Sequence, residues 1–206
     1  MLFGRGASTV SAAGSDTEAT LVAQARAGDE LAFEALVDRH EAAIYQLAWR
    51  MLRNREDALD AVQETFLRVF RGLASFRGEA SMRTWTYGIA LNVCRNKLES
   101  AEWKARPRQD SLQLVDPGDG EERERPLPDP APGPEATAYG SELRCALDAA
   151  LGRLTGEHRE IIVLRDVQGL EYEELAAILG CALGTVKSRL ARARAALRAA
   201  LEGVWP

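Results

Sequence analysis

Residues 171–201 read EYEELAAILGCALGTVKSRLARARAALRAAL, and this stretch decides the fold of the C-terminal part of the chain. Leu175, Ile178 and Leu179 recur at helical spacing, and the glutamates before them lie in the first turn, where carboxylates favour the helix dipole. The two glycines of residues 180–184 allow the sharp change of direction between paired helices. The stretch therefore predicts a helix-turn-helix.

The second helix of this pair is expected to begin at Thr185, a fair N-cap residue, and to end near Leu201. One face is an apolar stripe, and the opposite face carries Lys187, Ser188, Ala191, Arg192, Ala195 and Arg198. Small alanines between cations would let the helix lie deep in a DNA major groove, with Lys187 and Arg192 reaching base edges and phosphates. A solvated basic face is the alternative, which the preceding helix and turn disfavour.

Charge is distributed unevenly along the chain. The 206 residues carry a net charge of -5, whereas residues 185–206 hold five Lys or Arg and one acid. An acidic protein with a local basic end does not coat nucleic acid indiscriminately; the distribution indicates one focused phosphate-binding face.

Several classes of protein are disfavoured by composition. Cys94, Cys145 and Cys181 are widely separated, so we expect neither a disulfide framework nor a zinc site, and no cofactor. No apolar run approaches the roughly 18 residues of a membrane span, so we expect no membrane insertion and a cytoplasmic location. Residues 1–17 are rich in small residues and are expected to form a disordered leader.

Four helices are expected before residue 104, because all eight prolines lie at position 107 or later. Their expected ranges are 20–27, 31–52, 56–73 and 84–102. The third has a predicted buried side made of Ala58, Val62, Phe66, Leu67, Val69 and Phe70. Its predicted outward side, called here the acidic ridge, consists of Asp57, Asp60, Gln63 and Glu64. This ridge suits a basic partner protein, and a solvated helix face is the alternative.

The fourth expected helix and the loop before it combine aromatic, amide and cationic side chains. Trp85 is expected to pack, together with Ile89, Val93 and Leu98, while Arg83, Tyr87, Asn92, Arg95, Asn96 and Lys97 offer polar or aromatic groups. Aromatic rings stack on bases and cations follow the backbone, so this segment is a candidate to hold single-stranded DNA.

A linker separates this part from the helix-turn-helix. Residues 116–135 contain six prolines and seven acids against two arginines, a composition that cannot bury a core. Helical periodicity returns at residues 138–154. The sequence therefore predicts an all-α protein with two helical domains, 18–104 and 138–206, joined by a flexible acidic tether, 105–137.

Three blocks in this order resemble the sigma-70 family of bacterial RNA polymerase initiation factors, and within it the extracytoplasmic-function (ECF) group. The blocks are DALDAVQETFLRVF at 57–70, SFRGEASMRTWTYGIALNVCRNKL at 75–98 and GTVKSRLARARAAL at 184–197. The resemblance covers about residues 18–104 and 138–202. It implies a promoter-specificity subunit without enzymatic activity.

The resemblance also implies roles for particular residues. The acidic ridge would correspond to region 2.2, which docks on the coiled coil of the polymerase beta-prime subunit. The 76–84 loop and the helix that carries Asn92 would correspond to regions 2.3 and 2.4, which open the minus-10 element and capture a flipped base. The implied residues are Phe76, Arg77, Arg83, Trp85, Asn92, Arg95 and Asn96. The helix-turn-helix would correspond to region 4, with minus-35 contacts from Thr185, Lys187, Ser188, Arg189, Arg192 and Arg194. Further implied partners are the beta flap and an anti-sigma factor.

The chain departs from the family pattern at three places. Leu59 replaces a usual acid, Gly88 replaces a larger residue in mid-helix, and residues 154–156 lack the usual Leu-Pro. Two competing hypotheses stay open: a stand-alone helix-turn-helix regulator with an N-terminal sensor or dimerisation domain, and, least favoured, an enzyme. The acidic linker also allows self-inhibition by binding the basic helix, with a plain solvated tether as the alternative.

Overall fold

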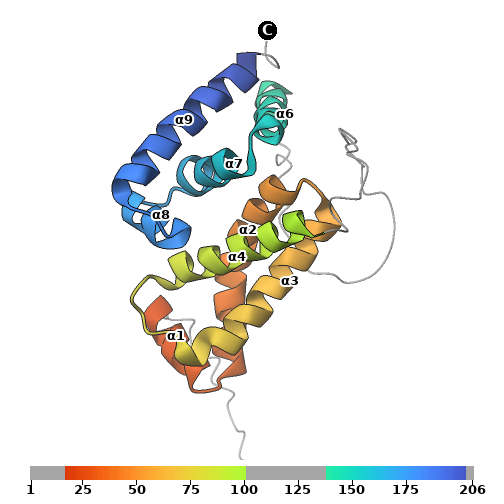
Figure 1. Ribbon diagram of the computed structural model, residues 1–206. Coiled ribbons are helices and arrows are strands. Elements are labelled where there is room, and N and C mark those ends of the chain that lie inside the picture. The colour runs from red at the N-terminus through yellow and green to blue at the C-terminus, as the bar shows by residue number, and fades with distance from the viewer. Residues whose placement is uncertain (1–16, 101–137, 203–206) are drawn as a thin grey trace, which may run out of the picture.

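The computed structural model describes residues 17–100 and 138–202, and every regular element in these ranges is a helix (Figure 1). The leader up to residue 16 and the linker lie outside the described residues. Within the described parts, no helix is both long enough and apolar enough to cross a bilayer. The expected all-α fold is confirmed.

Helices α1 (Glu18–Arg26), α2 (Glu30–Leu52), α3 (Arg55–Gly72) and α4 (Met82–Glu99) form the N-terminal bundle, with the short 3-10 helix η1 (Leu73–Ser75) after α3. Capping residues decide where these helices begin. The Asp29 carboxylate accepts the first amides of α2, the Asn54 side chain accepts the amide of Asp57, and Ser81 accepts the amide of Thr84. Because Ser81 is the N-cap, α4 begins two residues earlier than the sequence predicted.

The C-terminal part consists of α6 (Ala138–Arg153), α7 (Gly156–Ile162), the π-helical η2 (Val163–Val167), α8 (Tyr172–Leu179) and α9 (Leu183–Glu202). The break between α6 and α7 falls at Thr155, which caps α7. Gly180 ends α8 with a φ of 62°, a conformation that glycine adopts without steric cost. Helix α9 begins at Leu183, so Thr185 lies inside its first turn, and the prediction of Thr185 as N-cap was wrong.

The side of α3 that was expected to be buried is only partly so. Ala58, Val62 and Phe66 are buried, but Leu67 is 51% and Phe70 is 57% exposed. Asp57, which was expected to face outward, is 7% exposed. It lies in the first turn of α3, where a carboxylate suits the positive end of the helix dipole.

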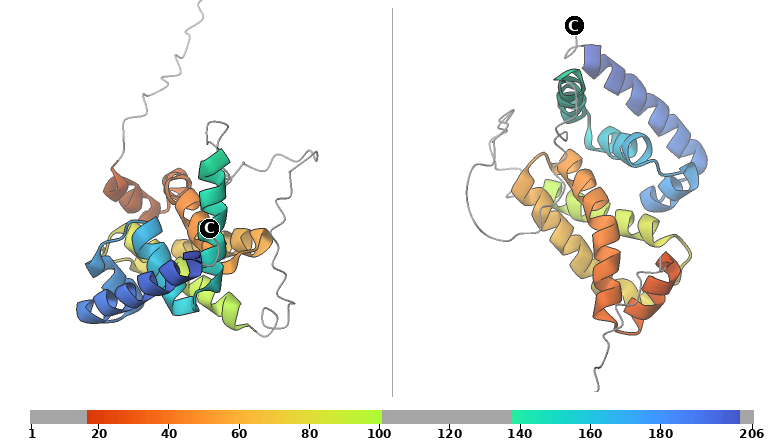
Figure 2. Two further views of the ribbon diagram at one scale, coloured as in Figure 1. Left: turned by 90° about the horizontal axis from the view of Figure 1, so that it is seen from above. Right: turned by 180° about the vertical axis from the view of Figure 1, so that it is seen from behind.

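The N-terminal and C-terminal helices pack against each other in this structure. One apolar cluster extends from α2, α3 and α4 into α6, α7, α8 and α9, and a smaller cluster lies under α1. Helix α8 packs on α4, and both views of Figure 2 keep the two groups of helices in contact. Helix α4 therefore contacts α2 and α3 of its own bundle and also contacts α8, which is far from it in sequence.

Candidate nucleic-acid and polymerase interfaces

The outer face of α9 has the cationic character that the sequence predicted. Lys187, Ser188 and Arg192 are exposed, while Val186 and Leu190 point into the core. The Ser188 hydroxyl donates to the Thr185 carbonyl at 3.1 Å, and the Arg192 Nε donates to the Ser188 carbonyl at 3.4 Å. These local bonds hold the face in one arrangement without covering it, so its cations remain able to meet phosphates and base edges.

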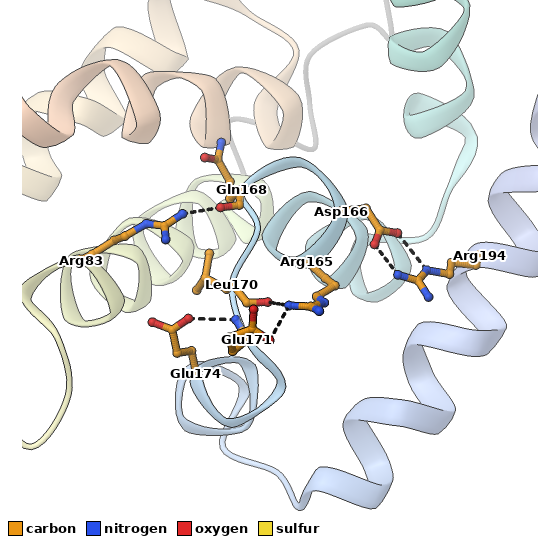
Figure 3. A network of polar contacts seen from close by, with 8 residues as sticks. All are labelled: Arg83, Arg165, Asp166, Gln168, Leu170, Glu171, Glu174 and Arg194. Atoms are coloured by element: carbon orange, nitrogen blue, oxygen red, sulfur yellow. Dashed lines mark hydrogen bonds and ion pairs between the residues drawn. The ribbon is translucent and has the colours of Figure 1, made fainter.

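Two further cations of α9 lie nearer its flanks. Arg189 is half-buried, and Arg194 is paired with Asp166 of η2 at 3.0 and 2.5 Å (Figure 3). The hydrogen bonds to Asp166 raise the pKa of Arg194. This acidic partner was not foreseen from the sequence, because it lies 28 positions away on another element. Arg194 is thus held to the body of the helix-turn-helix.

Tyr172, at the start of α8, was also missed. Its ring lies 4.7 Å from the Arg165 guanidinium carbon and 5.9 Å from the Lys187 ammonium nitrogen. An aromatic face attracts cations at such distances, so the ring helps to place Lys187 on the outer face. This contact could have been predicted from the sequence. Tyr172 is the first residue of the first helix of the helix-turn-helix, and that position lies close to the second helix.

On the N-terminal bundle, the aromatic residues of the predicted minus-10 segment gather at the start of α4. The rings of Phe76 and Trp85 lie 4.8 Å apart with an interplanar angle of 32°, and both are half-buried. Gly72 approaches Trp85 so closely that a Cβ there would lie 3.0 Å from the indole. Arg77 is exposed in the loop before α4. The pair forms a fixed aromatic platform at one end of the segment.

The remaining predicted minus-10 residues fall into two groups. Asn92 and Asn96 are one turn apart on α4 and are both exposed. Arg83 and Arg95 instead point toward the C-terminal helices and are hydrogen-bonded there. Tyr87, which was expected to offer its ring, is 1% exposed, and burial raises the pKa of its hydroxyl. The structure therefore separates an exposed amide pair from two occupied arginines.

The acidic ridge of α3 is shorter than the sequence indicated. Asp60 and Gln63 are exposed; Asp60 lies 3.6 Å from the Lys97 ammonium group, and Glu64 pairs with Arg68 at 2.7 Å. Asp57 is buried and does not contribute to this surface. The ridge that faces solvent is made of three residues.

An apolar groove borders the acidic ridge, and it was not predicted. Its lining residues are Glu30, Phe33, Gln63, Phe66, Leu67 and Phe70, around a volume of about 490 Å³. Phe33 and Phe70 meet edge to face at 5.1 Å, and Leu67 and Phe70 are 51% and 57% exposed. An exposed apolar surface with a polar rim is typical of a protein-protein contact. Gln63 belongs to both the groove and the ridge, so the two form one continuous surface.

No group of three or more His, Cys, Asp or Glu among the described residues is arranged to hold a metal ion. Burial raises the pKa of the Cys94 thiol to about 12. The surfaces described above offer cations and amides on α9 and α4, and an apolar and acidic surface on α3.

Comparison with known families identifies the chain. The family model Sigma-70 region 2 matches residues 36–104, and the model Sigma-70, region 4 matches residues 146–197. The chain belongs to the sigma-70 family, within the ECF RNA polymerase sigma factors. It is 35% identical over 182 residues to the ECF RNA polymerase sigma-E factor of Haemophilus influenzae, covering 86% of this chain and 92% of that protein. It is 37% identical over 181 residues to the factor of the same name from Escherichia coli, covering 88% and 92%.

Two solved structures are similar in fold. CnrH in complex with the cytosolic domain of CnrY has a TM-score of 0.66 at 30% identity, covering 91% of this chain and 99% of that chain. The sigma factor RpoE in complex with the anti-sigma factor NepR from Bartonella quintana has a TM-score of 0.60 at 26% identity, covering 82% and 96%. The region 2 match covers most of α2 and all of α3 and α4, and the region 4 match runs from the second half of α6 through most of α9.

Proposed function

We propose that this chain binds core RNA polymerase and directs initiation at promoters that it recognises through two separate DNA elements. The observation that carries the proposal is the combination, on one sigma-family chain, of an exposed basic recognition helix, an amide-bearing helix α4 and an apolar docking groove. Each part alone is common among helical proteins. Their combination on regions 2 and 4 matches the task of a promoter-specificity subunit.

For the minus-35 element, the proposed contacts are those of α9. Lys187, Ser188 and Arg192 face outward together and would meet base edges in the major groove, since such a groove admits one helix with its cations. Thr185, Arg189 and Arg194 lie at the flanks and would contact phosphates. To contact a phosphate, Arg194 would either break its hydrogen bonds to Asp166 or donate to both groups at once.

For the minus-10 element, Asn92 is the proposed reader of a flipped base. Its amide is exposed, and Asn96 lies one turn further along the same helix. Flipping a base costs a few kcal/mol, which hydrogen bonds to the base edge and stacking on an aromatic ring offset. Phe76 and Trp85 supply the aromatic platform, and Arg77, Arg83 and Arg95 supply cations for the backbone.

For polymerase, the proposed contact is the groove of α3 with Asp60, Gln63 and Glu64 at its edge, facing the beta-prime coiled coil. The exposed apolar groove residues Leu67 and Phe70 would supply most of the binding energy, because burial of apolar area is the main favourable term in association. Region 4 would meet the beta flap. An anti-sigma protein is a further proposed partner, supported by similarity to RpoE bound to NepR.

In this role the chain has no catalytic step of its own and acts in the cytoplasm, where polymerase is. We propose that it functions as two units, region 2 within 18–104 and region 4 within 138–206, connected by the linker 105–137. Simultaneous binding to two promoter elements requires that each unit be positioned on its own element of the DNA.

Binding to purified core polymerase distinguishes this function from that of a stand-alone regulator. We expect a stable stoichiometric complex with core by gel filtration, and promoter-specific DNA binding by that complex. A regulator with an N-terminal sensor would show no affinity for core and would bind its duplex tightly as the free protein. That second pattern would refute the proposed function.

A further inference from the structure

Region 4 forms an ion pair with Arg95, a cation that the proposed function assigns to the DNA backbone. Arg95 of α4 donates two hydrogen bonds to the carboxylate of Glu160 on α7, at 2.8 and 2.6 Å. Glu160 is only 5% exposed. A bidentate, charge-assisted pair of this kind is strong and fixes both side chains. The Arg95 guanidinium is thereby engaged by a carboxylate of the same chain.

A second group of contacts engages the other end of α4. The Thr84 hydroxyl donates to the carboxylate of Glu174 on α8 at 2.5 Å, and the Tyr87 hydroxyl donates to the Gln168 side-chain oxygen at 2.7 Å. Arg83 donates to the Gln168 backbone carbonyl (Figure 3). The three α4 side chains all find their partners in region 4. These contacts and the Arg95 pair together span three turns of α4.

Gly88 lies between these two groups, and α8 is seated on it. A Cβ at Gly88 would lie 4.0 Å from Cγ1 of Ile178, which is ordinary contact, so a larger side chain would meet α8. A glycine inside a helix weakens that helix, and the space at this position would accept an alanine but not a much larger side chain. Gly88 is thus one position at which α8 of region 4 lies next to α4 of region 2.

A third contact secures the far end of the interface. Arg159 of α7 donates to the Met51 carbonyl at the end of α2 at 2.9 Å, and it also donates to the carbonyls of Leu151 and Gly152 in its own unit. One guanidinium therefore ties the turn between α6 and α7 to the N-terminal bundle. Arg50 and Arg53 of the N-terminal part add contacts with Asp148 of α6, and the interface encloses shared apolar residues.

We propose that region 4 is an intramolecular competitor of minus-10 DNA: α8, seated on Gly88, and Glu160, bound to Arg95, hold the free chain closed until polymerase separates the two regions. The proposal rests on the proposed function of α4. The Glu160 carboxylate binds Arg95 and the Gln168 backbone carbonyl binds Arg83, and these are two α4 donors that the DNA backbone would otherwise use. Because the same donors cannot serve both, closure lowers the affinity of the free chain for the opened strand.

The first test changes the size of residue 88 in the full chain. Gly88→Leu places a bulky side chain under α8 while using a strong helix former, and Gly88→Ala is the matched control, because its Cβ fits. We expect Gly88→Leu to have a larger radius of gyration in X-ray scattering than Gly88→Ala. We also expect it to bind a single-stranded minus-10 oligonucleotide about tenfold more tightly, which is the gain when a closed state holding about 90% of molecules is removed.

The second test leaves α4 unchanged. Glu160→Gln removes the charge of the pair with Arg95, and Glu173→Gln removes the same charge from an exposed position on α8. Only Glu160→Gln is expected to open the chain and to increase binding of the oligonucleotide. Because Glu160 is outside the DNA-facing surface, a gain in affinity cannot come from a new contact with DNA.

The outcomes separate this inference from the proposed function. Equal radii of gyration for each variant and its control would overturn the closed state. Opening without a gain in oligonucleotide affinity would overturn the competition. If opening occurs but neither the wild-type chain nor any variant binds core polymerase, closure stands and the proposed function fails. If Gly88→Leu does not fold by circular dichroism, the Glu160→Gln comparison alone decides.

Discussion

At the scale of single residues, helical periodicity was sufficient to orient α9 but not α4. Lys187, Ser188 and Arg192 were predicted to face outward and do so, because the opposite face of α9 has an unbroken apolar stripe. Arg95 has no such guide: its partner Glu160 lies 65 positions away and belongs to another helix. Spacing within one helix carries no information about a partner at that distance.

Arg192 provides a test of base recognition. Arg192→Ala should reduce discrimination at one minus-35 base pair by about 1–3 kcal/mol, the usual value of a good side chain to base contact. Arg198→Ala, which removes the same charge further along α9, should weaken binding about equally for all sequences. Holoenzyme binding to a set of single-base promoter variants measures both. A uniform loss for Arg192→Ala would show that it contacts phosphate only.

Cys94 and Cys145 should differ strongly in reactivity. Burial raises the pKa of Cys94 to about 12, so its nucleophilic thiolate is scarce at pH 8, and Cys145 is exposed. We expect iodoacetamide at pH 8 to modify Cys145 and to leave Cys94 unmodified in the folded protein, as measured by peptide mass spectrometry. After denaturation both should react. Early modification of Cys94 in the folded protein would contradict its burial.

At the scale of elements, helix positions were predicted well, and the errors have identifiable causes. The start of α4 was misplaced because Ser81 and Thr84 are both plausible caps, and the structure uses Ser81. The exposed side of α3 was misassigned for a different reason. An apolar residue at the right period is expected to be buried, but the period does not say whether the covering partner belongs to the same chain. Within the described part of the chain, Leu67 stays 51% exposed and Phe70 stays 57% exposed, although Phe70 meets Phe33 edge to face.

Leu67 tests whether the uncovered groove binds polymerase. Leu67→Ser should weaken binding to core polymerase by tenfold or more if the groove is the contact, since about 1.4 kcal/mol is tenfold in affinity. The free energy of unfolding should change little, because Leu67 is already 51% exposed. Leu143→Ser is the matched control, being 50% exposed on α6. Competition binding to core measures the effect; equal affinity for the two variants would exclude the groove.

At the scale of the whole molecule, the sequence predicted the all-α class and the two groups of helices, but not that the groups pack together. The acidic, proline-rich linker indicated separate units, and composition alone cannot show what the units do when tethered. The interface includes Gly88, Tyr87 and Gln168, none of which has a distinctive pattern within its own helix or turn. Gly88 was visible as a departure from the family pattern, and only the structure gives it a neighbour.

The closed arrangement changes what is expected of the free chain. The basic face of α9 stays exposed in it, whereas Arg83 and Arg95 on α4 are bonded to region 4. If the proposed contacts are correct, duplex contacts at minus-35 are available before those arginines can serve the opened strand. We then expect both elements to be bound at once only after the two regions separate.

Transcription from genomic fragments with purified core polymerase tests the central claim most directly. Core alone should start at no specific site. Core with this chain should produce defined transcripts whose start sites share minus-35 and minus-10 sequences, and Asn92→Ala should abolish open-complex formation at these sites while core binding persists. The absence of any promoter-dependent start on any fragment, although the chain is folded and present in excess, would contradict the account.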